Sequence, residues 1–416
     1  MKRILGALFI LIGLSCVTYV VTYFVGREVN GVPELLSISL KGEKTVTLKL
    51  GDEYKDEGAK ASYDGKDITA TIKTIKNLDL KHIGTYKYIY SITYKKQEKN
   101  VERTIKVIDE VPPVIKINGR DKIVLATGRT YDDPGATATD NYDGDITKKI
   151  KVDTSQVNTN AVGVYKVTYT VADSSGNEAT AERVVDVRQA GGPNQRIAVL
   201  NYHFFYEESE KNICRESICE HMDRFREQLN YLRDNNFYAV PMDEYIGWMY
   251  GEIDLPEKSV LITVDDGAYG TGKTNGNHLI PTLEQYKMDA TLFLATGWWY
   301  IEDYRSDYLA LESHTHDLHY EGISGCDYRS KVNCVSYDEL MTDLKKSIEI
   351  LKSNNAFCFP FYDYSNMSIQ AVKDAGFRVA FVGGWRKSSR NDDKYKIPRY
   401  PIQDYTSLNE FISIVN

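Results

Sequence analysis

Two adjacent aspartates, Asp265 and Asp266, end the apolar run Leu261-Ile262-Thr263-Val264, and Gly267 follows them. The run predicts a buried strand, and in α/β proteins ligands bind at the carboxyl ends of strands. Successive side chains of an extended chain point to opposite sides, so one carboxylate can bind a metal while the other acts as a base. The alternative is a plain Asp-Gly turn, which requires only one acid.

Three of the seven histidines lie within six residues, in the segment Ser313-His314-Thr315-His316-Asp317-Leu318-His319. His314 and His319 are five positions apart, which would separate them on a helix, whereas a loop that turns at Asp317 lets them converge on one ion. Imidazole and carboxylate groups form a ligand set suited to Zn²⁺ or a related divalent metal. A surface histidine cluster without a metal is the alternative.

A third segment, Phe357-Cys358-Phe359-Pro360-Phe361-Tyr362-Asp363, predicts a strand that ends at a proline. Such a strand end could shape a pocket wall and direct a backbone N–H at a developing oxyanion. Because strands that end at proline are common, this segment alone indicates little.

Together and in this order, the Asp265-Asp266-Gly267 and His314–His319 segments resemble the polysaccharide deacetylase family, carbohydrate esterase family four, over about residues 196–402. The histidine spacing is similar to that of poly-N-acetylglucosamine deacetylases of biofilm exopolysaccharides, whereas peptidoglycan deacetylases usually have a spacing shorter by one. The resemblance implies that Asp266, His314 and His319 hold a divalent metal, Zn²⁺ first and Co²⁺ or Ni²⁺ as alternatives. It implies that Asp265 is the general base.

The resemblance also implies a substrate pocket around an acetamide carbonyl, which the metal and the backbone N–H of Phe361 would polarise. Pro360 and Thr315 would line this pocket. Trp385 and Arg399 would occupy the region of the family's fourth motif. The family's Pro-aromatic-Gly is here Pro360-Phe361-Tyr362, so the shape of the pocket differs. Three further aromatic residues could stack on sugar rings or pack in the core: Trp298, Trp299 and Tyr300.

The general acid departs from the commoner family pattern, in which it is a histidine near the C-terminus. No histidine follows His319 in this chain. The exopolysaccharide branch carries a Leu-x-Tyr-His segment before the aspartate pair, and residues 200–203 match it, which implies His203 as the acid. A strand-end histidine bonded to backbone is the alternative.

These segments require a domain of alternating strands and helices to bring them together. After a linker at 189–195, apolar runs predict strands at 197–202, 259–264, 291–294, 356–360 and 378–382. Helical spacing predicts helices at 218–235, 337–351 and 368–375. The alternation predicts a mainly parallel α/β domain, a distorted β/α barrel, over 196–416.

A tandem repeat precedes this domain. Residues 50–59 are echoed by 127–136, residues 64–69 by 143–147, and residues 84–88 by 163–167. Alternating side chains and Asp-Gly turns in each copy predict two β-sandwiches, at 33–109 and 110–188. The second copy resembles bacterial Ig-like modules, and we expect both to act as spacers or as weak adhesive units in contact with the cell wall. The loop 140–145 could bind Ca²⁺, or it could form Asx turns.

Residues 4–25 carry no charge, are mostly apolar, and are long enough to cross a bilayer as a helix. Lys2 and Arg3 precede them, so the positive-inside rule places the N-terminus in the cytoplasm. We expect an anchor at 1–28 and a single-pass cell-membrane protein with its other domains outside. The alternatives are a cleaved signal peptide and a lipoprotein at Cys16, although Gly13 is a poor match to a lipobox.

Charge and cysteines agree with export. The formal net charge is −8, and Lys2 and Arg3 carry +2 of it, so the exported part carries −10. This excess argues against a nucleic-acid partner and favours neutral glycans or cationic amino sugars. Two close cysteine pairs, Cys214 with Cys219 and Cys326 with Cys334, predict local disulfides and leave Cys358 unpaired.

The sequence therefore predicts a multidomain protein with an N-terminal transmembrane helix, two Ig-like β-sandwiches and a C-terminal α/β deacetylase domain. The expected activity is metal-dependent removal of N-acetyl groups from an extracellular N-acetylglucosamine polymer, either exopolysaccharide or peptidoglycan. One alternative is an O-acetyl esterase that acts on another glycan. A second is a catalytically weak glycan-binding or adhesion protein, against which the complete set of acids and histidines argues.

Overall fold

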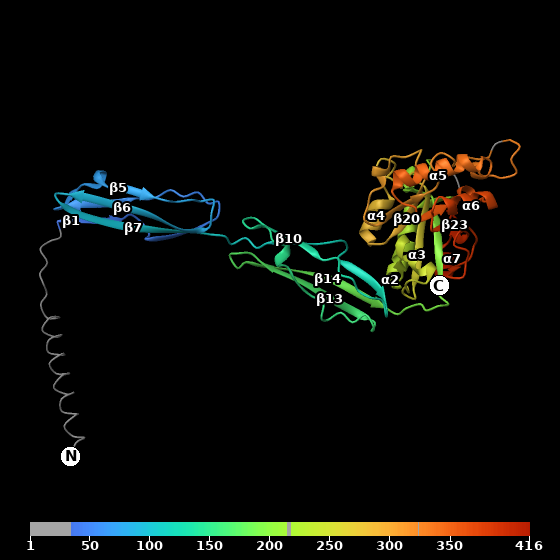
Figure 1. Ribbon diagram of the computed structural model, residues 1–416, viewed down its shortest axis with the longest axis horizontal. Coiled ribbons are helices and arrows are strands. Elements are labelled where there is room, and N and C mark those ends of the chain that lie inside the picture. Colours follow the sequence, from blue (N-terminus) through green and yellow to red (C-terminus); the bar gives the residue numbers. More distant parts are fainter. Residues whose placement is uncertain (1–34, 214–217, 323) are drawn as a thin grey trace, which may run out of the picture. The chain divides into compact units, whose positions relative to one another are not determined.

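The computed structural model describes residues 35–213, 218–322 and 324–416. Figure 1 shows two all-β modules followed by an α/β domain. The predicted membrane anchor at 1–28 lies outside the described residues. Within the described ranges, no helix has both the length and the apolar character needed to span a membrane. The anchor therefore stays a prediction.

The first β module contains a three-stranded sheet, β1-β3-β4, and a four-stranded sheet, β2-β7-β6-β5. Tyr88 and Tyr90 of β6 are buried with Ala59 of β3 between the sheets, as the alternating pattern predicts. The strands are β1 (Leu36–Leu40), β2 (Thr45–Lys49), β3 (Ala59–Tyr63), β4 (Lys66–Asp67), β5 (Lys73–Lys76), β6 (Gly84–Tyr94) and β7 (Gln97–Ile108).

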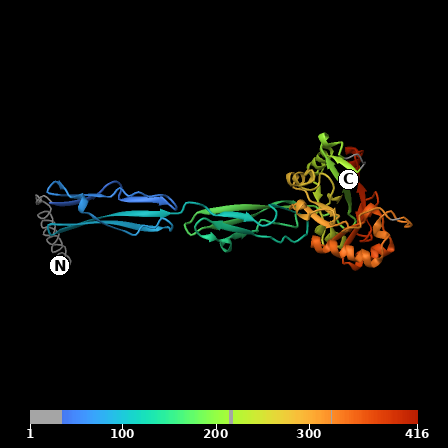
Figure 2. The ribbon, with the colours of Figure 1, turned by 90° about the horizontal axis from the view of Figure 1, so that it is seen from above.

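The second β module repeats this topology, with a three-stranded sheet β11-β10-β8 and a four-stranded sheet β12-β13-β14-β9 (Figure 2). A buried arginine recurs at the matching place: Arg103 pairs with Asp56 in the first module, and Arg183 with Asp133 in the second. The shared topology agrees with the repeat seen in the sequence. The strands are β8 (Val114–Ile117), β9 (Lys122–Ala126), β10 (Ala136–Asp140), β11 (Gly144–Asp145), β12 (Lys151–Asp153), β13 (Gly163–Ala172) and β14 (Glu178–Arg188).

Seven parallel strands form a closed barrel in the C-terminal domain, because β15 pairs with both β19 and β25. Around the ring the order is β15 (Arg196–Tyr202), β19 (Ser259–Asp266), β20 (Ala290–Leu294), β21 (Leu309–Ser313), β22 (Ala356–Cys358), β23 (Val379–Gly383) and β25 (Ile397–Pro401). The pairing of β21 with β22 is reduced to Ser313 and Phe357, so the barrel is distorted there. Four shorter strands lie outside the ring: β16 (Phe204–Tyr206), β17 (Cys219–His221), β18 (Tyr238–Ala239) and β24 (Ser388–Ser389).

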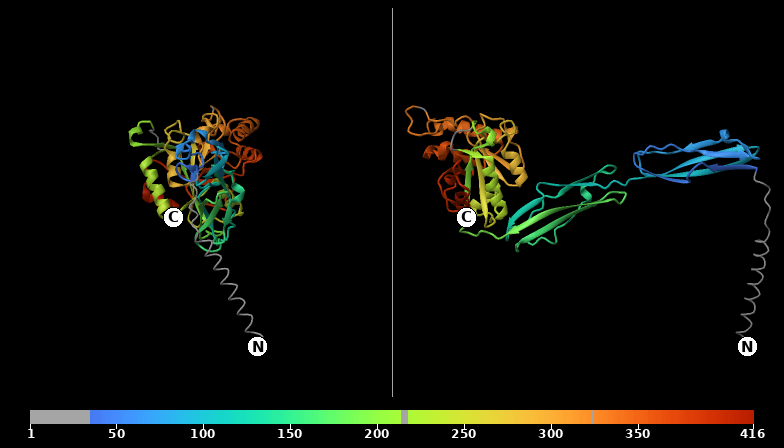
Figure 3. Two further views of the ribbon diagram at one scale, coloured as in Figure 1. Left: turned by 90° about the vertical axis from the view of Figure 1, so that its left-hand side faces the viewer. Right: turned by 180° about the vertical axis from the view of Figure 1, so that it is seen from behind.

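Helices surround the barrel strands (Figure 3). In α5, the Ser336 hydroxyl accepts a hydrogen bond from the Glu339 N–H at the first turn, and Leu340, Leu344 and Leu351 are buried. The helices are α2 (Met222–Asp234), α3 (Met242–Tyr250), α4 (Leu279–Tyr286), α5 (Tyr337–Leu351), α6 (Asn366–Asp374) and α7 (Leu408–Val415).

Several expected elements differ from the structure at their ends, and two of these differences have a clear physical reason. The helix expected from residue 218 begins at Met222, because residues 219–221 pair as a strand with β16. The strand expected to reach Pro360 ends at Cys358, and Pro360 begins a short 3-10 turn, where its missing N–H removes no helical bond.

One predicted disulfide is present and joins Cys326 to Cys334. Cys358 is free and buried, as expected. Cys214 lies outside the described residues, so its pairing with Cys219 stays a prediction.

Candidate metal centre

The parallel register of the barrel brings Asp266 and His314 to one edge. Asp266, the last residue of β19, is level with Leu294 of β20. Leu294 in turn is level with Ser313, the last residue of β21, and His314 follows directly. Both residues therefore lie at the carboxyl ends of nearby parallel strands, where ligands bind in α/β proteins.

Asp266, His314 and His319 converge on one point. The Nε2 atoms of His314 and His319 lie 3.2 Å and 3.0 Å from Oδ1 of Asp266. This oxygen is buried and has no hydrogen-bond partner among the described residues. Two ring nitrogens facing a buried, unbonded carboxylate oxygen form a three-ligand set that leaves further positions open, as in catalytic zinc sites. The residues present therefore fit a divalent metal.

The contacts of His314 suit a neutral imidazole ligand. Its Nδ1 donates a hydrogen bond of 2.8 Å to the Cys358 carbonyl oxygen, which leaves the Nε2 lone pair directed at Asp266. Burial lowers the pKa of His314. For His319, burial alone would lower the pKa, but the Asp266 carboxylate outweighs it and the pKa is raised. Protons and a metal therefore compete mainly at His319.

A residue not singled out in the sequence, Asp343 of α5, holds the histidine loop. Its two carboxylate oxygens accept hydrogen bonds from the backbone N–H groups of His316 and Asp317, at 2.7 Å and 2.6 Å. Asp343 is 8% exposed and lies on the same buried face of α5 as Leu340 and Leu344. An acid on the apolar face of a helix was the only sequence signal for this role.

Asp265 has different side-chain partners from Asp266. Arg399 of β25 donates two hydrogen bonds of 2.7 Å to its two carboxylate oxygens. Burial would raise the pKa of Asp265, but the Arg399 guanidinium outweighs it and lowers that pKa to about 2. Asp265 is therefore ionised at any pH near neutral.

His203 follows β15, one position beyond Tyr202, which is level with Val264 of β19. Its Nε2 lies 3.9 Å from Oδ2 of Asp265. Its Nδ1 is buried and makes no hydrogen bond to any described residue. The backbone-bonded alternative for this histidine thus finds no support in the side-chain contacts, and one ring nitrogen faces the acid pair.

The segment after β22 lies beside the metal-ligand set. The Phe361 ring packs on the His319 ring with 5.0 Å between centroids, and Phe361 has φ 59°. Pro360 is buried at the start of the turn. Tyr362, where the family has glycine, donates a hydrogen bond to the Asn201 side chain and lies against Gly383, where a Cβ would be 3.0 Å from its ring.

The remaining predicted pocket residues fall in different places. Thr315 is fully buried, with φ 78°. Arg399 is also fully buried against Asp265, so it offers no exposed atom to a substrate. Trp385 is 58% exposed, and its backbone N–H donates to the Arg399 carbonyl oxygen at 3.2 Å. Arg399 is thus placed to position Asp265 rather than to contact the substrate directly.

The three clustered aromatic residues also separate. The Trp299 indole N–H donates to the Asp266 carbonyl oxygen at 2.8 Å, so this ring supports the strand end. Trp298 packs edge-on to His319, with 4.9 Å between centroids, and donates to the Tyr320 hydroxyl at 3.0 Å. Tyr300 is 71% exposed. Trp298 thus contacts the metal-ligand residue His319, and Trp299 contacts the backbone of Asp266.

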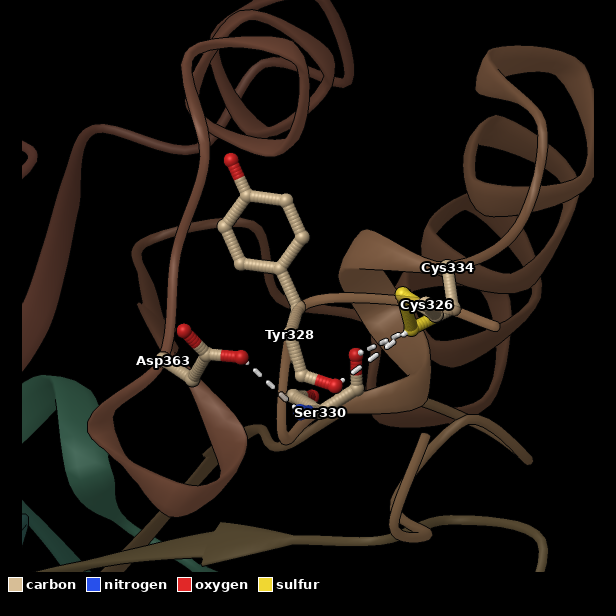
Figure 4. Close-up of a disulfide and its surroundings, with 5 residues drawn as sticks. All are labelled: Cys326, Tyr328, Ser330, Cys334 and Asp363. Carbon is tan, nitrogen blue, oxygen red and sulfur yellow. Dashed lines mark hydrogen bonds between the residues drawn. A yellow bond between two sulfur atoms is a disulfide. The ribbon is translucent and has the colours of Figure 1, made fainter. Parts of the chain in front are cut away.

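The disulfide between Cys326 and Cys334 closes a loop next to Asp363 (Figure 4). Within it, the Ser330 N–H donates to the Asp363 carboxylate at 2.8 Å. The Arg329 guanidinium lies 4.8 Å from the centroid of Phe361, the ring that packs on His319. The loop therefore covers the outer face of the Phe361 turn.

Comparison with known proteins matches residues 38–107 and 115–187 to the family described as bacterial surface protein, Ig-like domain. Residues 252–380 match the family described as polysaccharide deacetylase. A poly-beta-1,6-N-acetyl-D-glucosamine N-deacetylase of Staphylococcus aureus is 25% identical over 225 residues, 49% of this chain and 74% of the relative. The enzyme of that name from Staphylococcus epidermidis is 26% identical over 245 residues, 54% of this chain and 78% of the relative.

Among solved structures, the Streptococcus pyogenes deacetylase PplD in complex with acetate aligns with a TM-score of 0.46 and 18% identity, covering 54% of this chain and 99% of that one.

Proposed function

Because its C-terminal domain belongs to the polysaccharide deacetylase family and follows two bacterial surface Ig-like domains, we propose that this enzyme is a metal-dependent hydrolase of N-acetyl groups on an extracellular N-acetylglucosamine polymer. The observation that carries the proposal is the convergence of Asp266, His314 and His319 on one buried oxygen. A second acid, Asp265, lies beside them with His203 facing it. A divalent metal, a general base and a general acid together can hydrolyse an amide, and these residues could supply all three.

We propose the β-1,6-linked polymer as the substrate, with β-1,4-linked peptidoglycan as the alternative. The curated relatives are named for the β-1,6 polymer, which supports that choice. The net charge of −8 is compatible with a product that becomes cationic as acetyl groups leave.

A divalent metal held by Asp266, His314 and His319 would supply Lewis-acid activation of the water and of the acetamide carbonyl. Asp265 would accept the proton of the water, and its pairing with Arg399 keeps it ionised at the expense of basicity. The Phe361 N–H would donate to the oxyanion, and His203 would protonate the leaving amine. Trp298 would form one wall of the sugar site.

The test is acetate release by the full chain from β-1,6- and β-1,4-linked N-acetylglucosamine oligomers, after chelation and reloading with Zn²⁺, Co²⁺ or Ni²⁺. We expect metal-dependent release that falls by about 10³-fold in Asp265→Asn, as for loss of a general base. Asp254→Asn, an exposed acid paired with Arg390 ahead of β19, is the matched control and should keep full activity. No release from either oligomer with any metal would reject N-deacetylation, and release from O-acetylated glycans alone would assign the esterase activity instead.

We also propose that residues 1–28 anchor the chain in the cell membrane, with the other domains outside. The Cys326–Cys334 disulfide supports this placement, because disulfides persist in oxidising compartments. Retention of the chain in the membrane fraction after an alkaline carbonate wash is the expected result. Release of the whole chain by that wash would contradict the anchor.

A further inference from the structure

Three carboxylates far apart in the sequence meet in the second β module. Asp109 lies just after β7, Asp140 ends β10, and Asp173 follows β13. Each offers a carboxylate oxygen, and these oxygens lie within 4.8 Å of one another. Asp109 is 6% exposed and Asp173 is 8% exposed. Two of the three carboxylates are thus largely buried. Like charges in a buried place repel strongly unless a cation lies between them.

Two of these oxygens are buried without a partner. Oδ2 of Asp109 and Oδ2 of Asp140 accept no hydrogen bond from any described residue. Their other oxygens are used locally: Oδ1 of Asp109 accepts from the Val111 N–H and the Asn141 side chain, each at 3.2 Å. Lysine, arginine and histidine side chains of the described residues form no ion pair with this cluster.

The loop 140–145 contributes only its first residue to the cluster. Asp143 accepts hydrogen bonds from the Ser174 N–H and hydroxyl and pairs with Lys149 at 3.2 Å. Asp145 accepts from the Thr147 N–H at 2.9 Å. Asp140 also forms a turn, because its Oδ1 accepts hydrogen bonds from the Tyr142 and Asp143 N–H groups at 2.9 Å and 2.8 Å. The turns that were one alternative for the loop are therefore present, and Oδ2 of Asp140 is left without a partner at the cluster.

The first β module provides an internal comparison. The repeat aligns Asp140 with Tyr63, the last residue of β3, and Asp173 with Tyr94, the last residue of β6. The rings of Tyr63 and Tyr94 pack together with 5.0 Å between centroids. The same place in the fold is therefore filled by an aromatic pair in one copy and by a pair of acids in the other, so the topology alone does not require the acids.

We propose that Asp109, Asp140 and Asp173 bind a Ca²⁺ ion. The donor set consists only of oxygens, which suits a hard cation, and it contains no imidazole or thiol that would favour a transition metal. Calcium sites of extracellular modules have dissociation constants on the order of 10⁻⁴ to 10⁻³ M, and we expect that range. Because Asp109 belongs to the connection between β7 and β8, the ion ties this connection to the loops that follow β10 and β13.

The test is calorimetric titration of the full chain in detergent with CaCl₂ after removal of metals with EDTA. We expect one Ca²⁺ per chain, weakened by about tenfold or more in Asp140→Asn and in Asp173→Asn. Asp145→Asn, an acid of the same loop outside the cluster, is the matched control and should bind as the unaltered chain does. Binding should also survive in Asp266→Asn, which separates this site from the catalytic centre.

A second measurement requires no variant. A glutamate-specific protease should cleave after the exposed Glu110 about fivefold or more slowly in millimolar Ca²⁺. The reason is that the ion holds the adjacent Asp109 in place. Mg²⁺ should slow the cleavage less than Ca²⁺. No binding and no protection at about 10 mM Ca²⁺ would overturn the proposal. Equal loss of binding in Asp145→Asn, or loss in Asp266→Asn, would also overturn it.

Discussion

At the level of single residues, the two adjacent acids on β19 have different side-chain partners. Asp266 faces two imidazoles, whereas Asp265 is held by the buried guanidinium of Arg399. Strand alternation predicted different roles for the two acids, but no sequence pattern predicted the partner of Asp265. Arg399 lies 134 positions further along the chain, and only closure of the barrel brings β25 close to β19.

Arg399→Gln tests this division. Burial without the cation should raise the pKa of Asp265 from about 2, so the acidic limb of the kcat/KM profile should move to higher pH. Leaving a buried charge unpaired should also destabilise the fold by about 3 kcal/mol. The measurement is kcat/KM against pH, with Arg390→Gln, which breaks the pair with the exposed Asp254, as the control. An unchanged acidic limb in a folded Arg399→Gln enzyme would contradict this role.

Glu220 of β17 gives a stability prediction. Burial raises the pKa of its carboxyl from an ordinary 4.5 to about 8. An acid whose folded pKa is raised weakens the fold as pH rises from the unfolded value through the folded one, here from about 4.5 to 8. Glu220→Gln should remove this loss, because an amide oxygen can still accept the hydrogen bond from Gln228.

We therefore expect the unfolding free energies of Glu220→Gln and the parent to be similar near pH 5. At pH 9 the variant should be more stable by a few kcal/mol, on the order of 2 to 4. Denaturant unfolding at both pH values measures this difference, with the exposed Glu227→Gln of α2 as the control. Equal stability of variant and parent at pH 9 would show that Glu220 ionises freely in the folded protein.

At the level of elements, five barrel strands and three helices were predicted, whereas β21, β25, α3, α4 and α7 were not. The helix over 337–351 was predicted with its exact bounds, because Ser336 caps it and its leucines recur on one face. The strand β25 was missed, since the two prolines of Ile-Pro-Arg-Tyr-Pro argue against a barrel strand. The proposed metal-ligand residues were predicted from motif and spacing. Their supports, Asp343 and the Cys358 carbonyl, depend on tertiary contacts that no local pattern encodes.

Asp343→Ala tests the support that α5 gives to the histidine loop. Two backbone N–H groups between His314 and His319 would lose their acceptor, so the loop should hold the two rings less firmly. We expect metal affinity to fall by about 10- to 100-fold, as for other groups that orient metal ligands. Competition with a chromogenic chelator measures this affinity. Glu349→Ala removes an exposed ion pair with Lys346 on the same helix and should leave affinity unchanged.

At the level of the whole molecule, the residues proposed for catalysis all come from the C-terminal domain. They run from His203 to Arg399, whereas the proposed calcium ligands lie between Asp109 and Asp173. The order of the parts, two β-sandwiches and then an α/β barrel, was predicted from repeats and from the change of pattern near residue 190. The closure of seven strands into a ring could not be predicted, because no local signal states which strands pair.

Because all proposed catalytic residues lie in the C-terminal domain, we predict that a chain lacking residues 1–188 keeps its activity on short oligomers. We expect kcat/KM to change by less than about twofold, since every proposed catalytic group remains in place. Activity on long, cell-associated polymer should fall more, because the shortened chain lacks the anchor and both modules. Acetate release from both substrates by equal amounts of folded enzyme measures the difference. A loss of about tenfold or more on short oligomers would assign the β modules a direct part in catalysis.

The backbone at the metal centre has a consequence for evolution. Asp266 and Thr315 both have φ 78°, a conformation that glycine adopts freely and that other residues hold only under strain. At position 266, a glycine would relieve this strain, yet it would delete a proposed metal ligand. Selection for heat resistance alone would therefore not act to retain Asp266. Only selection that also monitors acetate release would retain it, so thermostable descendants of this enzyme should arise by changes elsewhere.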